Sequence, residues 1–237
     1  MNLKDININY DVRTDSKGMD PDSASKTLRL YHQLLWSKPL PNGQVMELTT
    51  RNCSYLRWND MYFGSDSFIV SFMHAGYKHR QMIMDGIPDF IAYRDNYLKR
   101  ACTIPGYIIF PKHVRSMNQQ KGFNRMIRDR WDLTLECIRR FYSGEPSPLD
   151  KVLESDREFY NLFVDFKGYV DFFLLQDCVD EDYNVKFWLD TPLWVSDPMP
   201  ETVEAYMDWI NKELDFVEKR GRRIEEYCKT KIIQTSM

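Results

Sequence analysis

Apolar and polar residues follow two different periods along this chain, and they divide it into a mixed first half and a helical second half. Apolar residues at three- and four-residue spacing predict helices, whereas apolar residues at every second position predict strands. The strongest helical pattern covers residues 118–142. One of its apolar faces consists of Ile127, Trp131, Leu135, Ile138 and Tyr142. The same segment also carries a second apolar face and a stripe of charged residues. We therefore expect the helix to pack against neighbours on two sides, and its charged side chains to form ion pairs or to face a cleft.

The first half of the chain opens with a polar, turn-rich segment at residues 1–27. Ser25 or Thr27 is placed to cap a helix over residues 28–36, which two following prolines end. Alternation predicts strands at 44–48 and 54–58, and Tyr62-Phe63 extends this small sheet before Gly64 interrupts it.

Further elements follow from the same periodicities. We expect a helix capped by Ser65 or Asp66 that ends near residue 73, helices at 78–84 and 88–102, and a buried strand at 107–110. The later segments predict helices at 148–153, 157–179 and 201–231, a strand at 185–189 and a loop at 191–200.

These elements predict an α+β fold, with a small antiparallel or mixed sheet in the N-terminal half and a predominantly helical C-terminal half. Composition shows no break, so we expect a single domain over residues 1–237, with a C-terminal amphipathic helix and tail at 201–237. At 43% hydrophobic residues, the chain can bury a full core.

The charge balance narrows the range of partners. The formal net charge is −3, with acidic and basic residues well mixed, which argues against a dedicated nucleic-acid or membrane-surface binder. A local basic cleft is compatible with this balance.

Cysteine usage and hydropathy indicate the compartment. The five cysteines are scattered without a CxxC pair, so neither a disulfide framework nor a zinc site is expected. The N-terminus lacks the basic and apolar regions of a signal peptide, and the longest apolar stretches are too short to cross a bilayer. We therefore expect a soluble cytoplasmic protein.

The charged stripe is the main candidate for chemistry. It consists of Arg128, Asp132, Glu136, Arg139 and Arg140. Spacing at i,i+4 allows the pairs Arg125–Asp129, Arg128–Asp132 and Glu136–Arg140. One interpretation is an internal salt-bridge ladder that ties this helix to its neighbours. In the other, the arginines bind a phosphate or carboxylate, and Asp132 or Glu136 is the catalytic acid or base.

The loop at residues 112–124, through which the chain enters this helix, supports the second interpretation. It follows a buried strand and precedes a helix start, an arrangement that directs backbone N–H groups towards an anion. An ordinary polar surface loop is the alternative. The ligand-binding candidates in and around this pocket are Lys112, His113, Asn118, Asn124, Arg128, Arg139 and Arg140, together with His32 and Lys38 from the N-terminal segment.

Other motifs are weaker. Asp11, Asp15, Asp20 and Asp22 lack the glycine and closing glutamate of a calcium loop, so helix capping and turns explain them better. The Asp165-x-Lys167 pattern matches an element of metal-dependent nucleases, but it falls inside an apolar helical segment. We predict no metal site, and no motif identifies a cofactor.

Three stretches together carry a resemblance to a known family. They are DPDSASKTLRLYHQLLWSKPLPNG within residues 10–43, GYIIFP at 106–111 with GFNRMIRDRWDLTLECIRRFY at 122–142, and FKGYVDFFLLQD at 166–177. The combination resembles a bacterial family known only as a domain of unknown function. The resemblance implies a bacterial intracellular protein and brings no activity, cofactor or catalytic residue with it.

Two hypotheses of function remain open. In the first, a polar pocket binds a phosphate-bearing small molecule, such as a nucleotide, or a nucleic-acid end, and whether catalysis occurs there is undecided. In the second, the protein is a non-catalytic interaction or structural protein. Its stripe is then an internal ion-pair network, and its surface binds a protein partner or a second copy of itself.

Overall fold

The structure is a computed structural model that describes residues 2–50, 55–68, 78–111, 130–189, 193 and 200–235. At its centre is a three-stranded antiparallel sheet in the order β1-β2-β3. The strands are β1 (Leu56–Trp58), β2 (Met61–Ser67) and β3 (Tyr107–Pro111). Every residue of β3 is buried, as its unbroken apolar run predicts. The expected small sheet in the N-terminal half is confirmed, and so is the α+β class.

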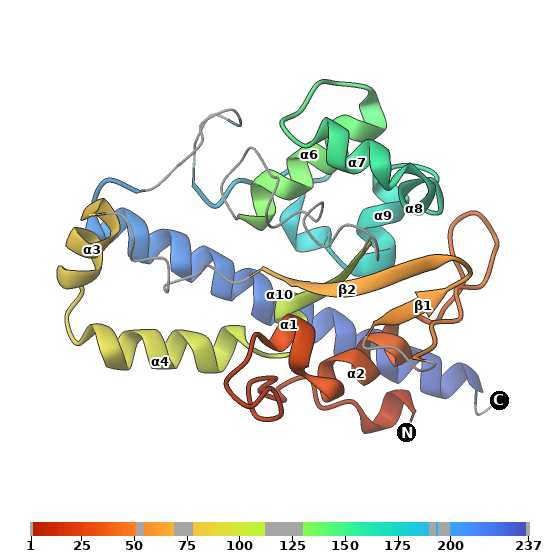
Figure 1. The fold of residues 1–237 in the computed structure, drawn as a ribbon, viewed down its shortest axis with the longest axis horizontal. Helices are drawn as coiled ribbons and strands as arrows, with labels where there is room; N and C mark the ends of the chain where they lie inside the picture. The colour runs from red at the N-terminus through yellow and green to blue at the C-terminus, as the bar shows by residue number, and fades with distance from the viewer. Residues whose placement is uncertain are drawn as a thin grey trace.

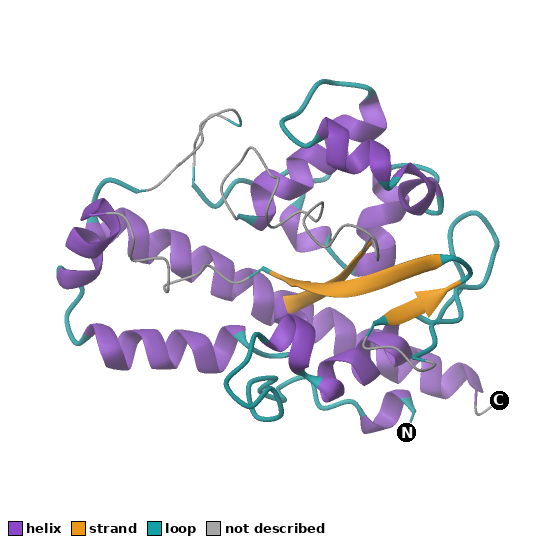
Figure 2. Ribbon diagram, in the orientation of Figure 1, coloured by secondary structure: helices purple, strands orange, loops and turns teal. Residues whose placement is uncertain are grey.

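The described residues of the N-terminal half also form several helices (Figures 1 and 2). They are η1 (Leu3–Asp5), α1 (Pro21–Ala24), α2 (Lys26–Trp36), α3 (Lys78–Asp85), α4 (Phe90–Ala101) and η2 (Ile104–Gly106). The predicted cap of α2 is confirmed, because the Ser25 hydroxyl accepts a hydrogen bond from the N–H of Leu28 at 3.1 Å.

The C-terminal half is almost entirely helical. Its helices are α6 (Trp131–Ser143), α7 (Asp150–Ser155), α8 (Arg157–Asn161), α9 (Phe166–Phe173), η4 (Gln176–Cys178) and α10 (Val203–Thr235). In the view of Figure 1, α6 to α9 lie above the sheet, and α1 and α2 lie below it. The long helix α10 contacts η1, η2, α3, α4 and η4, so it connects the two halves of the chain.

Aromatic rings fill the core between these layers. Phe163, Phe172 and Phe173 have ring centroids 4.9–5.2 Å apart, and Trp36 of α2 packs against Phe173 at 5.3 Å. Such tilted and edge-on contacts add to the hydrophobic stabilisation that the buried area provides.

Three predictions about strands are wrong. Residues 44–48 form only an isolated bridge, Pro39 with Val45, because this backbone folds over a tight turn at Gly43. Val185 likewise makes only an isolated bridge with Val179, so 185–189 is no strand. Gly64 does not interrupt β2: it pairs with Phe110, and Ser65 and Asp66 continue the ladder instead of capping a helix.

One helix prediction also needs correction. The segment 157–179 is not one helix, because Val164 has a positive φ and Asp165 then caps the new helix α9. The described part of the helix predicted at 118–142 is α6, which begins at Trp131 because Arg130 has an extended backbone. Residues 118–129 lie outside the described residues. The predicted end of this helix is confirmed, because Gly144 adopts the left-handed conformation that closes α6.

Candidate functional site

Asp132, the first candidate for a catalytic acid or base, lies buried in the first turn of α6, where its carboxylate is held by four donors. Arg130 donates through Nε at 3.0 Å and also through Nη2. The backbone N–H groups of Leu133 and Trp188 donate at 3.0 and 2.8 Å. The arginine that pairs with Asp132 is therefore one that helical spacing does not identify, because Arg130 lies outside the helix.

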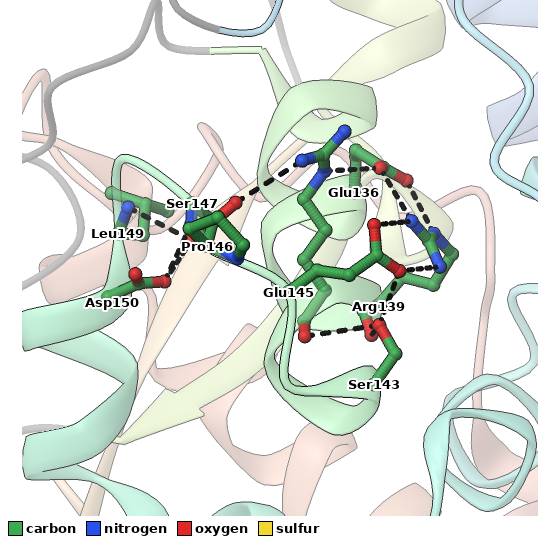
Figure 3. A network of polar contacts seen from close by, with 9 residues as sticks. Glu136, Arg139, Ser143, Glu145, Pro146, Ser147, Leu149 and Asp150 are labelled. Carbon is green, nitrogen blue, oxygen red and sulfur yellow. Dashed lines mark hydrogen bonds and ion pairs between the residues drawn. The ribbon is translucent and has the colours of Figure 1, made fainter.

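Glu136, the second candidate, belongs to an ion-pair network at the other end of α6 (Figure 3). Arg139 donates to both of its carboxylate oxygens at 2.9 and 3.0 Å, and Arg140 Nε donates at 2.7 Å. The predicted Glu136–Arg140 pair is thus confirmed. Arg139 also donates twice to Glu145, which lowers the pKa of that carboxyl to about 2.

All four described charges of the stripe thus have partners within the chain. A ligand that bound Arg139 or Arg140 would have to compete with these ion pairs. The other stripe residue, Arg128, lies outside the described residues, as do Lys112, His113, Asn118 and Asn124. The anion-binding segment expected there stays a prediction.

His32 is buried in α2, and among the described residues its Nε2 has no hydrogen-bond partner. The cavity that it lines has a volume of about 10 Å³, the space of roughly one water molecule. Burial, together with the positive charge of Arg220, lowers the pKa of His32 to about 3.

This burial predicts a pH dependence of stability. The pKa of His32 is lower in the folded protein than its ordinary 6.5, so below that pH only the unfolded chain gains a proton. We expect this group alone to lower the free energy of unfolding by about 2 kcal/mol between about pH 7.5 and pH 5. Urea titrations of wild type and His32→Leu at both pH values measure it. Equal pH dependence in the two proteins would contradict the assignment.

Lys38 is the candidate whose surroundings are most unusual. It lies two residues after the end of α2 and is buried, and its Nζ donates to the carbonyl oxygen of Phe172 at 2.6 Å. Three rings surround the ammonium, with centroids at 4.9 Å for Trp36, 4.4 Å for Phe172 and 4.6 Å for Tyr227. No carboxylate among the described residues forms an ion pair with it. Burial and the charges of Arg220 and Lys231 lower the pKa of Lys38 to about 7.

A second buried cation lies on the same aromatic cluster. The guanidinium of Arg220 is 5.7 Å from the ring centroid of Trp36 and donates to the carbonyl oxygen of Phe173 at 3.2 Å. Phe172 and Phe173 are the last residues of α9, where carbonyl groups lack partners within the helix. Lys38 and Arg220 therefore both donate to the carbonyl groups at the negative end of this helix, where a positive charge is favourable.

Lys38 also lines an open cleft of about 540 Å³ beside α9 and α10. Phe172 and Tyr227, two of the rings around the ammonium, line the same cleft, so the ammonium lies at its wall. The other charged residues of the cleft are Asp165, Lys167, Asp171 and Lys231. Lys167 pairs with Asp171, and Asp165 caps α9 by accepting from the N–H of Gly168 at 2.7 Å.

Gly168 shapes the wall of this cleft. A Cβ at this position would lie 2.1 Å from the carbonyl oxygen of Phe163 and 3.2 Å from Cγ of Pro41. Only glycine therefore lets the start of α9 approach the preceding chain and the segment after Lys38 so closely.

The sequence identified Lys38 but missed the rest of this cleft. Lys167 and Asp165 were noted only as a nuclease-like pattern, and in the structure they serve as an ion-pair partner and a helix cap. Tyr227 and Lys231 carry no local signal, because they belong to the polar last helix. Only the packing of α10 brings them beside a residue at the opposite end of the chain.

Metal chemistry gains no support from the part of the chain that the structure describes. No group of three histidine, cysteine or carboxylate side chains there could hold a metal ion. Cys102, Cys137, Cys178 and Cys228 are free and buried. Of the acidic N-terminal cluster, Asp15 accepts from Ser25 and Thr27, and Asp20 caps α1, as capping and turn formation predict.

Comparisons with known proteins agree with the kinship expected from the sequence. The model of one family, described as a family of unknown function, matches residues 6–224. No curated protein and no solved structure matches the chain. Within the described residues, no helix combines the length and the apolar character needed to cross a membrane.

Proposed function

For this chain, which belongs to the family of unknown function DUF6994, we propose that the cleft beside Lys38 binds a small anionic molecule. A phosphate-bearing molecule such as a nucleotide fits the chemistry best. The observation that carries this proposal is the ammonium of Lys38, buried at the wall of the cleft without a carboxylate partner among the described residues.

The charge balance of the cleft favours an anion. A buried ammonium without a counter-ion is costly, and a bound anion would supply the missing charge. Among the described residues, one of the three donors of Lys38 is used, by the carbonyl oxygen of Phe172. Lys231 also lines this cleft, and Lys167, a third lysine there, pairs with Asp171.

The size and apolar lining of the cleft favour a ligand that also carries a ring. A volume of about 540 Å³ falls within the usual range for small-molecule sites. Of the aromatic residues that line it, Tyr227 is half-buried, whereas Phe163 and Phe172 are buried. A nucleobase can stack on the accessible Tyr227 ring, while its phosphate reaches the lysines.

A thermal-shift titration tests the proposal. The probes are phosphate, pyrophosphate, adenosine monophosphate and a 5′-phosphorylated oligonucleotide, with uncharged adenosine as a control. A ligand at 100 times its Kd should stabilise the wild type by about 2.7 kcal/mol. Lys38→Met should weaken binding at least about tenfold, because it removes a charge-assisted hydrogen bond. Lys151→Met, a change of an exposed lysine on α7, should bind like the wild type.

Two results would overturn the proposal. One is equal stabilisation of wild type and Lys38→Met by every anion that binds. The other is the absence of stabilisation by any anion of a well-folded wild type. Either result would favour the other hypothesis, a protein that binds a protein partner or itself. The bacterial origin and cytoplasmic location stay predictions from the sequence.

A further inference from the structure

The amine of Lys38 has surroundings that suit a nucleophile as well as an anion-binding group. We propose that Lys38 forms an imine with an aldehyde or ketone group of the anionic molecule that occupies the cleft. This inference rests on the proposed function and adds a substrate class to it, namely a carbonyl compound that carries a phosphate or carboxylate.

The geometry supports this role in two ways. Lysines become nucleophiles when they are desolvated in an apolar pocket or lie near another cation, and Lys38 meets both conditions. The centroids of three aromatic rings lie within 4.9 Å of the Lys38 Nζ, and these rings exclude water from much of the surface of the amine. Arg220 contacts the same Trp36 ring from α10.

The charged and titratable groups around Lys38 favour its neutral form. From α10, Arg220 and Lys231 disfavour a further positive charge, while Cys228 opposes them more weakly. From α9, Asp165, Lys167 and Asp171 line the cleft, and the two carboxylates are occupied by a helix cap and by an ion pair. With a pKa of about 7, roughly half of the Lys38 side chains are neutral amines at neutral pH.

The reaction is a condensation that needs no oxidant or reductant. The lone pair of the neutral amine attacks the carbonyl carbon, and the carbonyl oxygen takes up a proton to give a carbinolamine. Loss of that oxygen as water, with the second amine proton, leaves a carbon–nitrogen double bond to Nζ. The open cleft admits the carbonyl compound and releases the water.

Reductive trapping tests the proposal on the full chain. The protein is incubated near pH 7 with cyanoborohydride and either pyridoxal 5′-phosphate or glyoxylate, and peptide mass spectrometry locates the secondary amine. We expect Lys38 to react at least tenfold faster than the exposed Lys151. The rate should rise with pH around a midpoint near the pKa of Lys38, about 7.

Lys38→Arg is the matched control variant. It keeps a cation for the anion and for the end of α9, but it removes the nucleophile. We expect it to lose labelling at position 38, while the exposed Lys151 is labelled at the rate found in the wild type. Circular dichroism confirms that each variant is folded.

The outcomes separate this inference from the proposed function. Stabilisation by phosphate without faster labelling of Lys38 would overturn the imine proposal and leave the anion site standing. Fast labelling of Lys38 by glyoxylate and by an uncharged aldehyde alike, without any stabilisation by anions, would overturn the anion site. Labelling of Lys38 that an excess of phosphate slows would support both.

Discussion

Asp132→Ala is expected to lower the free energy of unfolding by about 3–5 kcal/mol, because it removes one partner of a buried ion pair. Both side chains of the pair with Arg130 are fully buried. The guanidinium also donates to the carbonyl oxygen of Leu189 at 2.9 Å and lies 5.5 Å from the ring centroid of Trp209, but these neutral groups do not replace the charge of the lost carboxylate. It also deprives the N–H of Trp188 of its acceptor.

Urea denaturation of Asp132→Ala measures this cost. Asp215→Ala is the matched control, since Asp215 is also a helical aspartate but forms an exposed i,i+4 pair with Lys219. Such a pair contributes only about 0.3–0.5 kcal/mol. The double variant Arg130→Met, Asp132→Leu should recover part of the loss, because it buries no unpaired charge. If Asp132→Ala cost no more than the control, the buried pair would not have the structural role assigned to it.

Arg220→Met is expected to lower the free energy of unfolding by about 3 kcal/mol or more, because three buried carbonyl oxygens lose their donor. Arg220 Nη1 donates to the carbonyl oxygens of Pro105 and Tyr107 at 2.6 and 2.7 Å. Its Nε and Nη2 donate to the carbonyl oxygen of Phe173. One side chain thus joins α10 to η2, to β3 and to the end of α9.

The same helix provides the control for this prediction. Arg222 lies two residues further along α10 and is exposed, so Arg222→Met should change stability by less than about 0.5 kcal/mol. Arg220→Lys keeps a positive charge but cannot reach all three carbonyl groups, and we expect an intermediate loss. Equal stability of the Met variants at positions 220 and 222, measured by urea denaturation, would refute the anchoring role.

Local signals allowed part of this fold to be predicted. Ser25 caps the start of α2, and Gly144 ends α6 in the left-handed conformation. The apolar run that ends at Pro111 forms β3. Each of these features depends on the backbone preferences of a few adjacent residues. The wrong strand predictions concern elements that need a pairing partner elsewhere in the chain. The segment 44–48 has strand-like alternation, but its backbone forms only single bridges, and alternation does not supply the neighbouring strand that a ladder needs.

The candidate site shows the same limit. The pattern on α6 identified Glu136 with Arg140, which are neighbours on one helix face. It also allowed a pair of Arg128 with Asp132, which stays a prediction because Arg128 lies outside the described residues. It missed Arg130, which binds that carboxylate from an extended backbone. No periodicity describes a contact made just outside a helix.

By itself, the sequence determined the α+β class, the membership of a family of unknown function and the caps and ends of several helices. These properties follow from short-range chemistry that a linear pattern records. Only the tertiary structure decided that Lys38, His32 and Arg220 are buried, and that Tyr227 and Lys231 lie beside Lys38. The reason is physical: desolvation and charge–charge interactions depend on distances in space, and α10 brings together residues that the chain keeps far apart.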